Sequence, residues 1–226
     1  MNNPTITLVS LIAFAITLTF HEFSHALAGH LLGDDTAKRF GRLTLNPIPH
    51  IDPLGTVVLP LLGAFTGLPV IGWAKPVPFN PYNLKYGKWG AVMVALAGPL
   101  ANLMVAVFSV ILLIILTGPI GMSPYNLLAV FLVLLTLISL VLAAFNLLPI
   151  NPLDGSRLIS ALLDAPKYRN VRVFLETKGP LILMLVILLD FLGPVSFLDR
   201  LFSFIVTGFF WVFGAVPLLL AVFSAM

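Results

Sequence analysis

The stretch LVSLIAFAITLTFHEFSHALAGHLLG, residues 8–33, is apolar enough to cross a bilayer, yet it carries His21, Glu22 and His25 near its middle. An ionisable side chain inside a membrane helix costs roughly 2.5–3.5 kcal/mol on insertion scales, so such groups rarely lack a role. These three side chains therefore either line a water-filled route or bind a ligand.

The composition of the 226-residue chain is that of a membrane protein. Hydrophobic residues make up 59% of it and charged residues only 9%, whereas soluble domains carry about 25% charged residues. The absence of cysteine excludes disulfides and thiolate metal sites. The pI of the chain is basic, near 9.4. In a membrane protein such an excess usually comes from basic loops beside anionic lipid, so we expect no nucleic-acid partner.

Apolar runs predict an all-α polytopic membrane protein with about five to six membrane helices. Helices are expected at about 5–32, 88–117, 124–148, 179–192 and 198–224. The apolar segment 54–73 is broken by proline and glycine, which fits either a broken spanning helix or a re-entrant element. Because we find no internal repeat or linker, we expect one domain over residues 1–226.

The loop charges predict an orientation. Eleven of the twelve basic residues follow the first helix, follow the broken segment, or lie between the third and fourth long helices. If the broken segment is re-entrant, all three clusters lie on one face, which the positive-inside rule makes cytoplasmic. If it spans, two clusters fall on opposite sides. The re-entrant interpretation is favoured, and it places the N-terminus outside.

The motif HEFSH, residues 21–25, has the spacing of a metal site. On a helix, His21 and His25 point the same way one turn apart and can share one Zn²⁺. Glu22 is rotated by about 100° from His21, where it can act as a general base on a metal-bound water. His30 lies on the opposite side of the helix and is excluded as a ligand. A proton path is the alternative interpretation.

A catalytic zinc needs a third protein ligand and one open position. Asp154 follows Pro149 and Pro152, which must interrupt a helix that has just crossed the membrane. The break would aim a side chain into the interior, although an aspartate before a short helix is also an ordinary N-cap, and the local sequence favours the cap. We expect His50 to stabilise a loop or act as a gate, not to bind metal.

Three motifs together resemble the site-2 proteases, which are intramembrane zinc metallopeptidases: HEFSH, AGPLAN at 97–102 and FNLLPINPLDG at 145–155. Residues 41–56 and 72–81 resemble the compact prokaryotic branch, which lacks PDZ and CBS modules. The resemblance implies that His21, His25 and Asp154 bind one Zn²⁺ per chain and that Glu22 is catalytic.

The resemblance also implies roles for three asparagines. Asn146 is expected to face the active site, where its amide could donate to the substrate carbonyl, although capping backbone left open at the proline break is an equal alternative. Asn102, with Gly98 and Pro99, belongs to a motif that serves either helix packing or catalysis. Asn151 joins Asn102 and Asn146 as a candidate for contacting substrate or supporting the metal ligands.

The function implied is an intramembrane zinc endopeptidase that hydrolyses peptide bonds within or near transmembrane segments, as in regulated intramembrane proteolysis. Its partners would be transmembrane protein substrates and membrane lipid, in the cytoplasmic membrane of a prokaryote, with the active site nearer the cytoplasmic face. We expect a re-entrant or β-hairpin segment within 41–81 to receive the unwound substrate. The alternative is a metal-ion or proton transporter, which should show two related halves.

Overall fold

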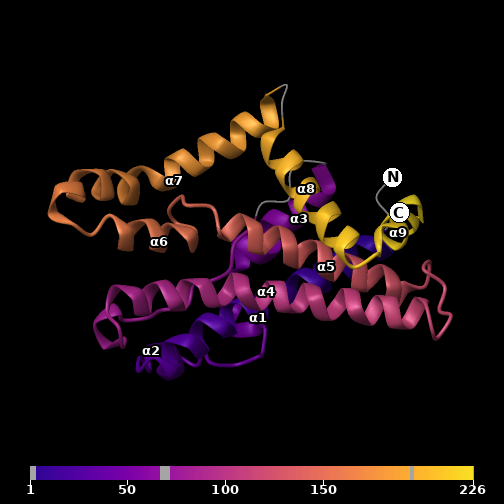
Figure 1. Ribbon diagram of the computed structural model, residues 1–226, viewed down its shortest axis with the longest axis horizontal. Coiled ribbons are helices and arrows are strands. Elements are labelled where there is room, and N and C mark those ends of the chain that lie inside the picture. Colours follow the sequence, from indigo (N-terminus) through magenta and orange to yellow (C-terminus); the bar gives the residue numbers. More distant parts are fainter. Residues whose placement is uncertain (1–3, 67–71, 194–195, 226) are drawn as a thin grey trace.

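The computed structural model describes residues 4–66, 72–193 and 196–225, and these residues form helices and no strand. The long apolar helices are α1 (Pro4–Leu31), α4 (Lys88–Thr117) and α5 (Leu127–Asn146). Figure 1 shows α4 and α5 running side by side, with α1 against both. The all-α expectation is confirmed.

The core lies where these three helices meet. Ala13, Ala106 and Ala129 are fully buried there, and such small side chains let membrane helices approach closely. Thr17 on α1 and Ser139 on α5 share a buried hydrogen bond of 3.0 Å between their hydroxyls. The site-bearing helix α1 is thereby fixed against its neighbours.

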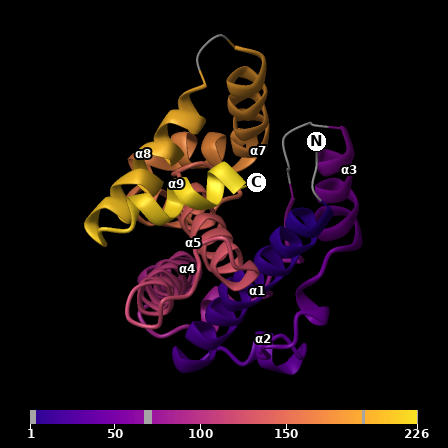
Figure 2. The ribbon, with the colours of Figure 1, turned by 90° about the vertical axis from the view of Figure 1, so that its right-hand side faces the viewer.

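The remaining helices are shorter or peripheral. They are α2 (Thr36–Arg39), η1 (Ile48–His50), η2 (Pro53–Val58), α3 (Leu59–Thr66), η3 (Pro81–Asn83), α6 (Gly155–Leu162), η4 (Pro166–Tyr168), α7 (Arg169–Leu192), α8 (Phe197–Val212) and α9 (Val216–Ala225). Figure 2 shows α7, α8 and α9 gathered on the side of α5 away from α3.

The number of spanning helices differs from the expected five to six. Among the described residues, three helices are long and apolar enough to cross a bilayer, or four if the bent pair of 166–192 and 197–212 counts as one span. The helix expected at 179–192 begins earlier, at Arg169. Its first turns are charged and therefore resemble a loop in the sequence, but they are helical. The helix expected at 198–224 is two helices, because Gly214 has a φ of +64° that ends α8.

The broken segment is helical from Pro53 to Thr66, so a β-hairpin is not found in its described part. This helical part is about 20 Å long, too short to cross a hydrocarbon core of about 30 Å. Residues 67–71 of the expected segment lie outside the described residues. The chain then returns beside 50–55, where Trp73 N–H donates to the Gly55 carbonyl (3.2 Å) and Lys75 N–H donates to the His50 carbonyl (3.1 Å).

Candidate metal centre and active site

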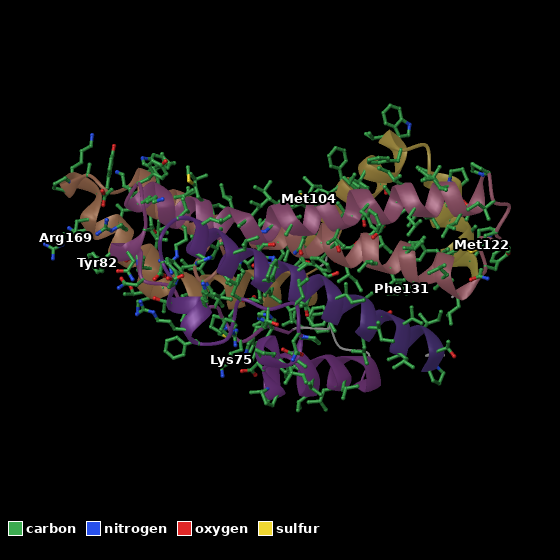
Figure 3. All side chains as sticks on the ribbon, turned by 90° about the horizontal axis from the view of Figure 1, so that it is seen from below. Lys75, Tyr82, Met104, Met122, Phe131 and Arg169 are labelled. Atoms are coloured by element: carbon green, nitrogen blue, oxygen red, sulfur yellow. The ribbon has the colours of Figure 1, made fainter. Side chains whose placement is uncertain are left out.

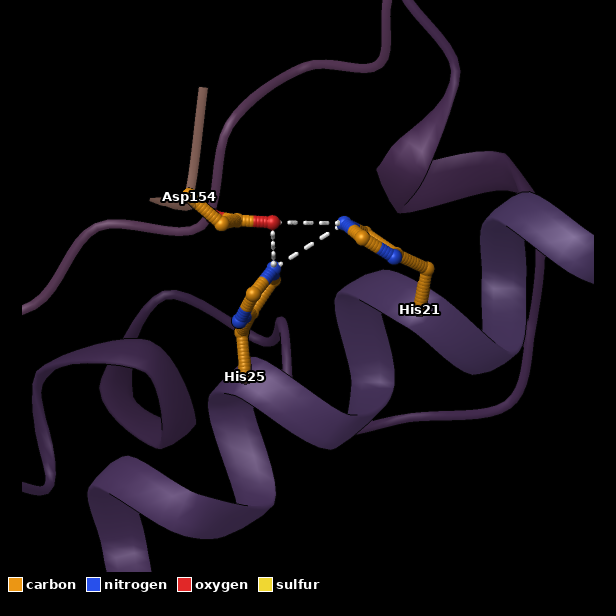
Figure 4. Close-up of side chains that lie close together, drawn as sticks. All are labelled: His21, His25 and Asp154. Atoms are coloured by element: carbon orange, nitrogen blue, oxygen red, sulfur yellow. Dashed lines mark hydrogen bonds and ion pairs between the residues drawn. The ribbon is translucent and has the colours of Figure 1, made fainter. Parts of the chain in front are cut away.

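The candidate metal ligands converge from two distant parts of the chain. His21 and His25 lie one turn apart on α1, and Asp154 directly precedes α6. His21 Nε2 lies 3.1 Å from His25 Nε2 and 3.2 Å from Asp154 Oδ2. His25 Nε2 lies 3.4 Å from the same oxygen. The three atoms therefore form a nearly equilateral triangle (Figure 4).

The proline break returns Asp154 to α1. The helix α5 ends at Asn146, before Pro149, and α6 begins at Gly155. A Cβ atom at Gly155 would collide with the Leu147 carbonyl, so glycine is needed where the chain folds back. Asp154 occupies the N-cap position of α6, but its side chain makes no cap hydrogen bond. The N-cap interpretation favoured by the local sequence is therefore not realised.

The triangle fits one face of a zinc tetrahedron. Bonds of about 2.0–2.1 Å at tetrahedral angles put ligand atoms roughly 3.3 Å apart, close to the three separations. Asp154 Oδ2 is enclosed and has no hydrogen-bond partner. If both imidazoles are neutral, three lone pairs point toward one another in a buried place without hydrogen-bond donors, which costs free energy. A cation bound between them offsets that cost. Within the described ranges no other group of His, Asp or Glu side chains has this arrangement.

The partner of His25 on α4 sets its tautomer. His25 Nδ1 lies 2.7 Å from the Val94 carbonyl, which can only accept, so Nδ1 carries the proton and donates it. The lone pair is then on Nε2, the atom that faces His21 and Asp154. Metal-ligating histidines almost always donate their second ring N–H in this way.

The partner of His21 is the fully buried side chain of Asn102, whose amide lies 3.0 Å from His21 Nδ1. Its Nδ2 faces the ring and its Oδ1 has no partner. The two amide orientations differ only in which atom faces the imidazole. With Oδ1 facing it, Nδ1–H donates to the amide and Nε2 is free to bind metal. Of the three candidate asparagines, Asn102 is thus the one that contacts a ligand.

Gly98 provides the space for both imidazoles. A Cβ atom at this position would lie 2.5 Å from His25 Nε2 and 2.7 Å from His21 Cε1. Any side chain there would displace the rings, since real Cβ contacts are never so short. The motif AGPLAN therefore contributes a gap at Gly98 and a hydrogen-bond partner at Asn102.

The other candidates lie elsewhere. Asn146 donates from Nδ2 to the Leu142 carbonyl, 2.9 Å away within α5, so this bond does not cap the backbone at the proline break. Asn151 donates to the Glu176 carbonyl at 2.9 Å and so ties the turn before α6 to α7. His30 pairs with Asp35 at 2.6 Å. His50 is buried and its Nε2–H donates to the Thr44 carbonyl at 2.9 Å, consistent with a loop-stabilising role.

Glu22 is buried beside the triangle, with 7% of its surface exposed. It makes no hydrogen bond or ion pair with any other residue that the structure describes. A buried carboxylate that directly follows His21 in the chain is a candidate general base.

Two charged residues that organise the loops were not singled out from the sequence. Arg42 is 4% exposed, and its guanidinium donates to the carbonyls of Pro49, Lys75 and Pro76. It joins the segment before η2 to the returning chain. The only available signal was a basic residue, Arg42, at the start of the motif at 41–56.

Asp34, 1% exposed, is the second. Its carboxylate accepts hydrogen bonds from Thr36, from Asn83 Nδ2 and from the Asn80 N–H. Burial alone would raise the pKa of Asp34, but the hydrogen bonds from Thr36, Asn83 and Asn80 hold the pKa below its usual value. It fixes the chain before α4 to the turn after α1.

A membrane helix with a buried HExxH motif, joined by an aspartate from a second element, defines a membrane zinc metalloprotease. Comparison with known proteins agrees. Residues 113–189, which include Asp154, match the model of Peptidase family M50. The chain is 37% identical over 189 residues to "Putative zinc metalloprotease YwhC" of Bacillus subtilis, covering 82% of this chain and 80% of that protein.

Two further relatives carry the name "Putative zinc metalloprotease Rip2". The identity is 34% over 140 residues for the protein of Mycolicibacterium smegmatis and 35% over 141 residues for that of Mycobacterium tuberculosis. Each alignment covers 62% of this chain and 51% of the relative. No solved structure gives a significant match. The chain belongs to peptidase family M50, the site-2 protease family, and its cofactor is Zn²⁺.

Proposed function

We propose that this protein is an intramembrane endopeptidase that hydrolyses peptide bonds within or beside transmembrane segments of membrane-protein substrates. The observation that carries the proposal is the triangle of His21 Nε2, His25 Nε2 and Asp154 Oδ2, with all separations at or below 3.4 Å, on a spanning helix. Roughly 26 Å of helix separates Pro4 from His21 and roughly 15 Å separates His21 from Leu31. These lengths support a site within the depth of a bilayer.

In this proposal His21, His25 and Asp154 bind the metal and Glu22 handles the proton. A Zn²⁺ ion held by these three residues would supply a Lewis acid for the scissile carbonyl and would lower the pKa of an attacking water. Glu22 accepts the proton of that water and passes it to the nitrogen of the leaving amine. Val94 and Asn102 hold the two imidazoles in place. Asn146 keeps a second amide N–H, so its contact with the substrate carbonyl stays a prediction.

The orientation is supported by contacts that bring three loops to one end. Lys85 N–H donates to the Leu32 carbonyl at 2.8 Å, which joins the end of α1 to the approach to α4. Lys88 pairs with Asp164, after α6, at 3.1 Å. Figure 3 shows Tyr82 and Arg169 at one end of the molecule and Met122 at the other. These contacts support a shared face for the basic loops, as the re-entrant topology requires, and we propose that this face lies in the cytoplasm of a prokaryotic cell.

Substrate entry is proposed beside residues 41–81. A helical substrate hides its carbonyls in hydrogen bonds, so it must unwind locally before a carbonyl reaches the metal. Described residues of this segment, between 47 and 61, lie beside residues 11–19 of α1, the stretch just before His21. Arg42 ties Pro49 to the returning chain at Lys75. The transporter alternative is not favoured, since the named relatives are metalloproteases.

Glu22→Gln tests the proposal. The purified variant in liposomes should retain zinc and lose cleavage of a co-reconstituted model transmembrane substrate, because an amide cannot accept the proton. Asp164→Asn, a change of the same kind on an exposed ion pair, should cleave normally. Near-normal turnover by Glu22→Gln would refute the general-base role.

A further inference from the structure

A cavity of about 180 Å³ lies between α1 and residues 47–61. On the α1 side its wall includes Leu11, Ala15 and Leu18, and on the opposite side His50, Thr56 and Leu61. None of the lining residues carries a formal charge. The cavity is separate from the three ligand atoms, and neither the family match nor the names of the relatives assigns it a role.

The cavity continues the face of α1 that carries the catalytic glutamate. Leu11, Ala15, Leu18 and Glu22 follow one another at steps of four, three and four residues, which is the spacing of a single helix face. Leu18 lies one turn before Glu22, about 6 Å along the axis. The cavity therefore begins on α1 one turn from the proposed general base.

The size and chemistry of the cavity define its occupant. A cavity of about 150 Å³ lined by aliphatic and aromatic residues accepts benzene, so 180 Å³ accommodates a large aliphatic or aromatic side chain. Thr56 donates to the Trp73 carbonyl and Thr19 to the Ala15 carbonyl. His50 Nδ1, the unprotonated ring nitrogen once Nε2–H donates to the Thr44 carbonyl, has no partner, and no formally charged side chain lines the cavity. A charged occupant would therefore be left without compensation.

We propose that this cavity is a specificity pocket that receives a large apolar side chain of a substrate residue flanking the scissile bond. The proposal rests on the proposed protease function. It predicts that Ala15, whose small side chain leaves room on the α1 wall, limits the size of the accepted residue.

The test measures a preference ratio. The cleavage site of a model transmembrane substrate is mapped by mass spectrometry, and the three positions on either side are changed one at a time to Ala or Phe. At one position the parent protein should cleave the Phe substrate about tenfold faster or more, the usual range for filling an apolar pocket. Ala15→Leu should bring this Phe/Ala ratio to about one or below.

A second variant moves the preference the other way. Phe14, also in the wall, becomes smaller in Phe14→Ala, which should raise cleavage of a Trp substrate relative to the Phe substrate even if Ala15→Leu folds poorly. Ile12→Phe is the matched control, since Ile12 is on α1, 47% exposed and outside the cavity, and it should leave both ratios unchanged.

The outcomes separate the pocket from the protease function. Cleavage by the parent and by both cavity variants with unchanged ratios overturns the pocket alone, as it would if a lipid chain filled the cavity. The absence of any size preference in the parent at all six positions also overturns the pocket. Failure of the parent to cleave any substrate overturns the proposed function, and the pocket with it.

Discussion

His25 on α1 donates its Nδ1 proton to the Val94 carbonyl on α4, 2.7 Å away. This contact joins the two helices at the depth of the site and leaves Nε2 free to bind metal. The position of α4 therefore helps to shape the candidate metal centre, although none of its side chains is a proposed ligand.

Gly98→Ala should disrupt the metal centre, because the new Cβ would lie 2.5 Å from His25 Nε2. We expect zinc affinity to fall by about ten- to hundredfold, the range seen when the surroundings of a ligand are altered. The control is Gly208→Ala on α8, where a Cβ would meet nothing within 4 Å. Zinc titration of both variants decides; equal affinities would show that the rings tolerate the methyl group.

Asn102→Ala should weaken zinc binding by about ten- to hundredfold, because His21 Nδ1 would lose its partner. Asn102→Asp should restore much of the affinity, since a carboxylate oxygen can accept from Nδ1–H. Rescue by aspartate would indicate that Oδ1 faces the ring. A purely structural role predicts loss of affinity in both variants, with unfolding temperatures lowered alike.

Asp34→Asn should destabilise the fold in a pH-dependent way. The pKa of Asp34 is lowered in the folded state, whereas an unfolded aspartate has a pKa of about 3.9. The carboxylate therefore stabilises the fold above about pH 4, and this contribution is lost as the pH falls through the lowered folded value. The loss at pH 7 should be on the order of 1–3 kcal/mol.

Unfolding temperatures of the parent and Asp34→Asn, measured from pH 7 to pH 3 in detergent, should converge below about pH 4. Asp199→Asn is the control, since that side chain is exposed in the first turn of α8. A difference in unfolding temperature that stays constant over this pH range would mean that the charge of Asp34 does not contribute to the stability of the fold.

The topology predicts which loops share a side of the membrane. Single cysteines at Lys38 and Tyr82, both exposed, should react with an impermeant thiol reagent from the same side, and one at Ser123 from the opposite side. The chain has no cysteine of its own, so labelling is unambiguous. Labelling of positions 38 and 82 from opposite sides would contradict the re-entrant segment.

Local patterns were sufficient for α1 and its paired histidines, because helical spacing alone puts His21 and His25 on one face. Asp154 was reached through the proline break and the family resemblance, since its own neighbourhood reads as an N-cap. The Val94 contact had no sequence signal, because any residue supplies a backbone carbonyl. The early start of α7 was missed because Arg172 and Glu176, 3.8 Å apart at i and i+4, lie on a polar helical turn that resembles a loop.

The central claim, that a side chain beyond α5 completes the metal centre of α1, is tested most directly by the zinc content of Asp154→Asn. Asparagine is as good an N-cap as aspartate but lacks the charge that binds a dication. We predict that the zinc affinity of the purified variant falls by at least ten- to hundredfold, the range seen when a residue that supports a metal ligand is lost. The control variant Asp164→Asn should retain one zinc per chain. An Asp154→Asn protein that binds zinc as tightly as the parent would contradict the account.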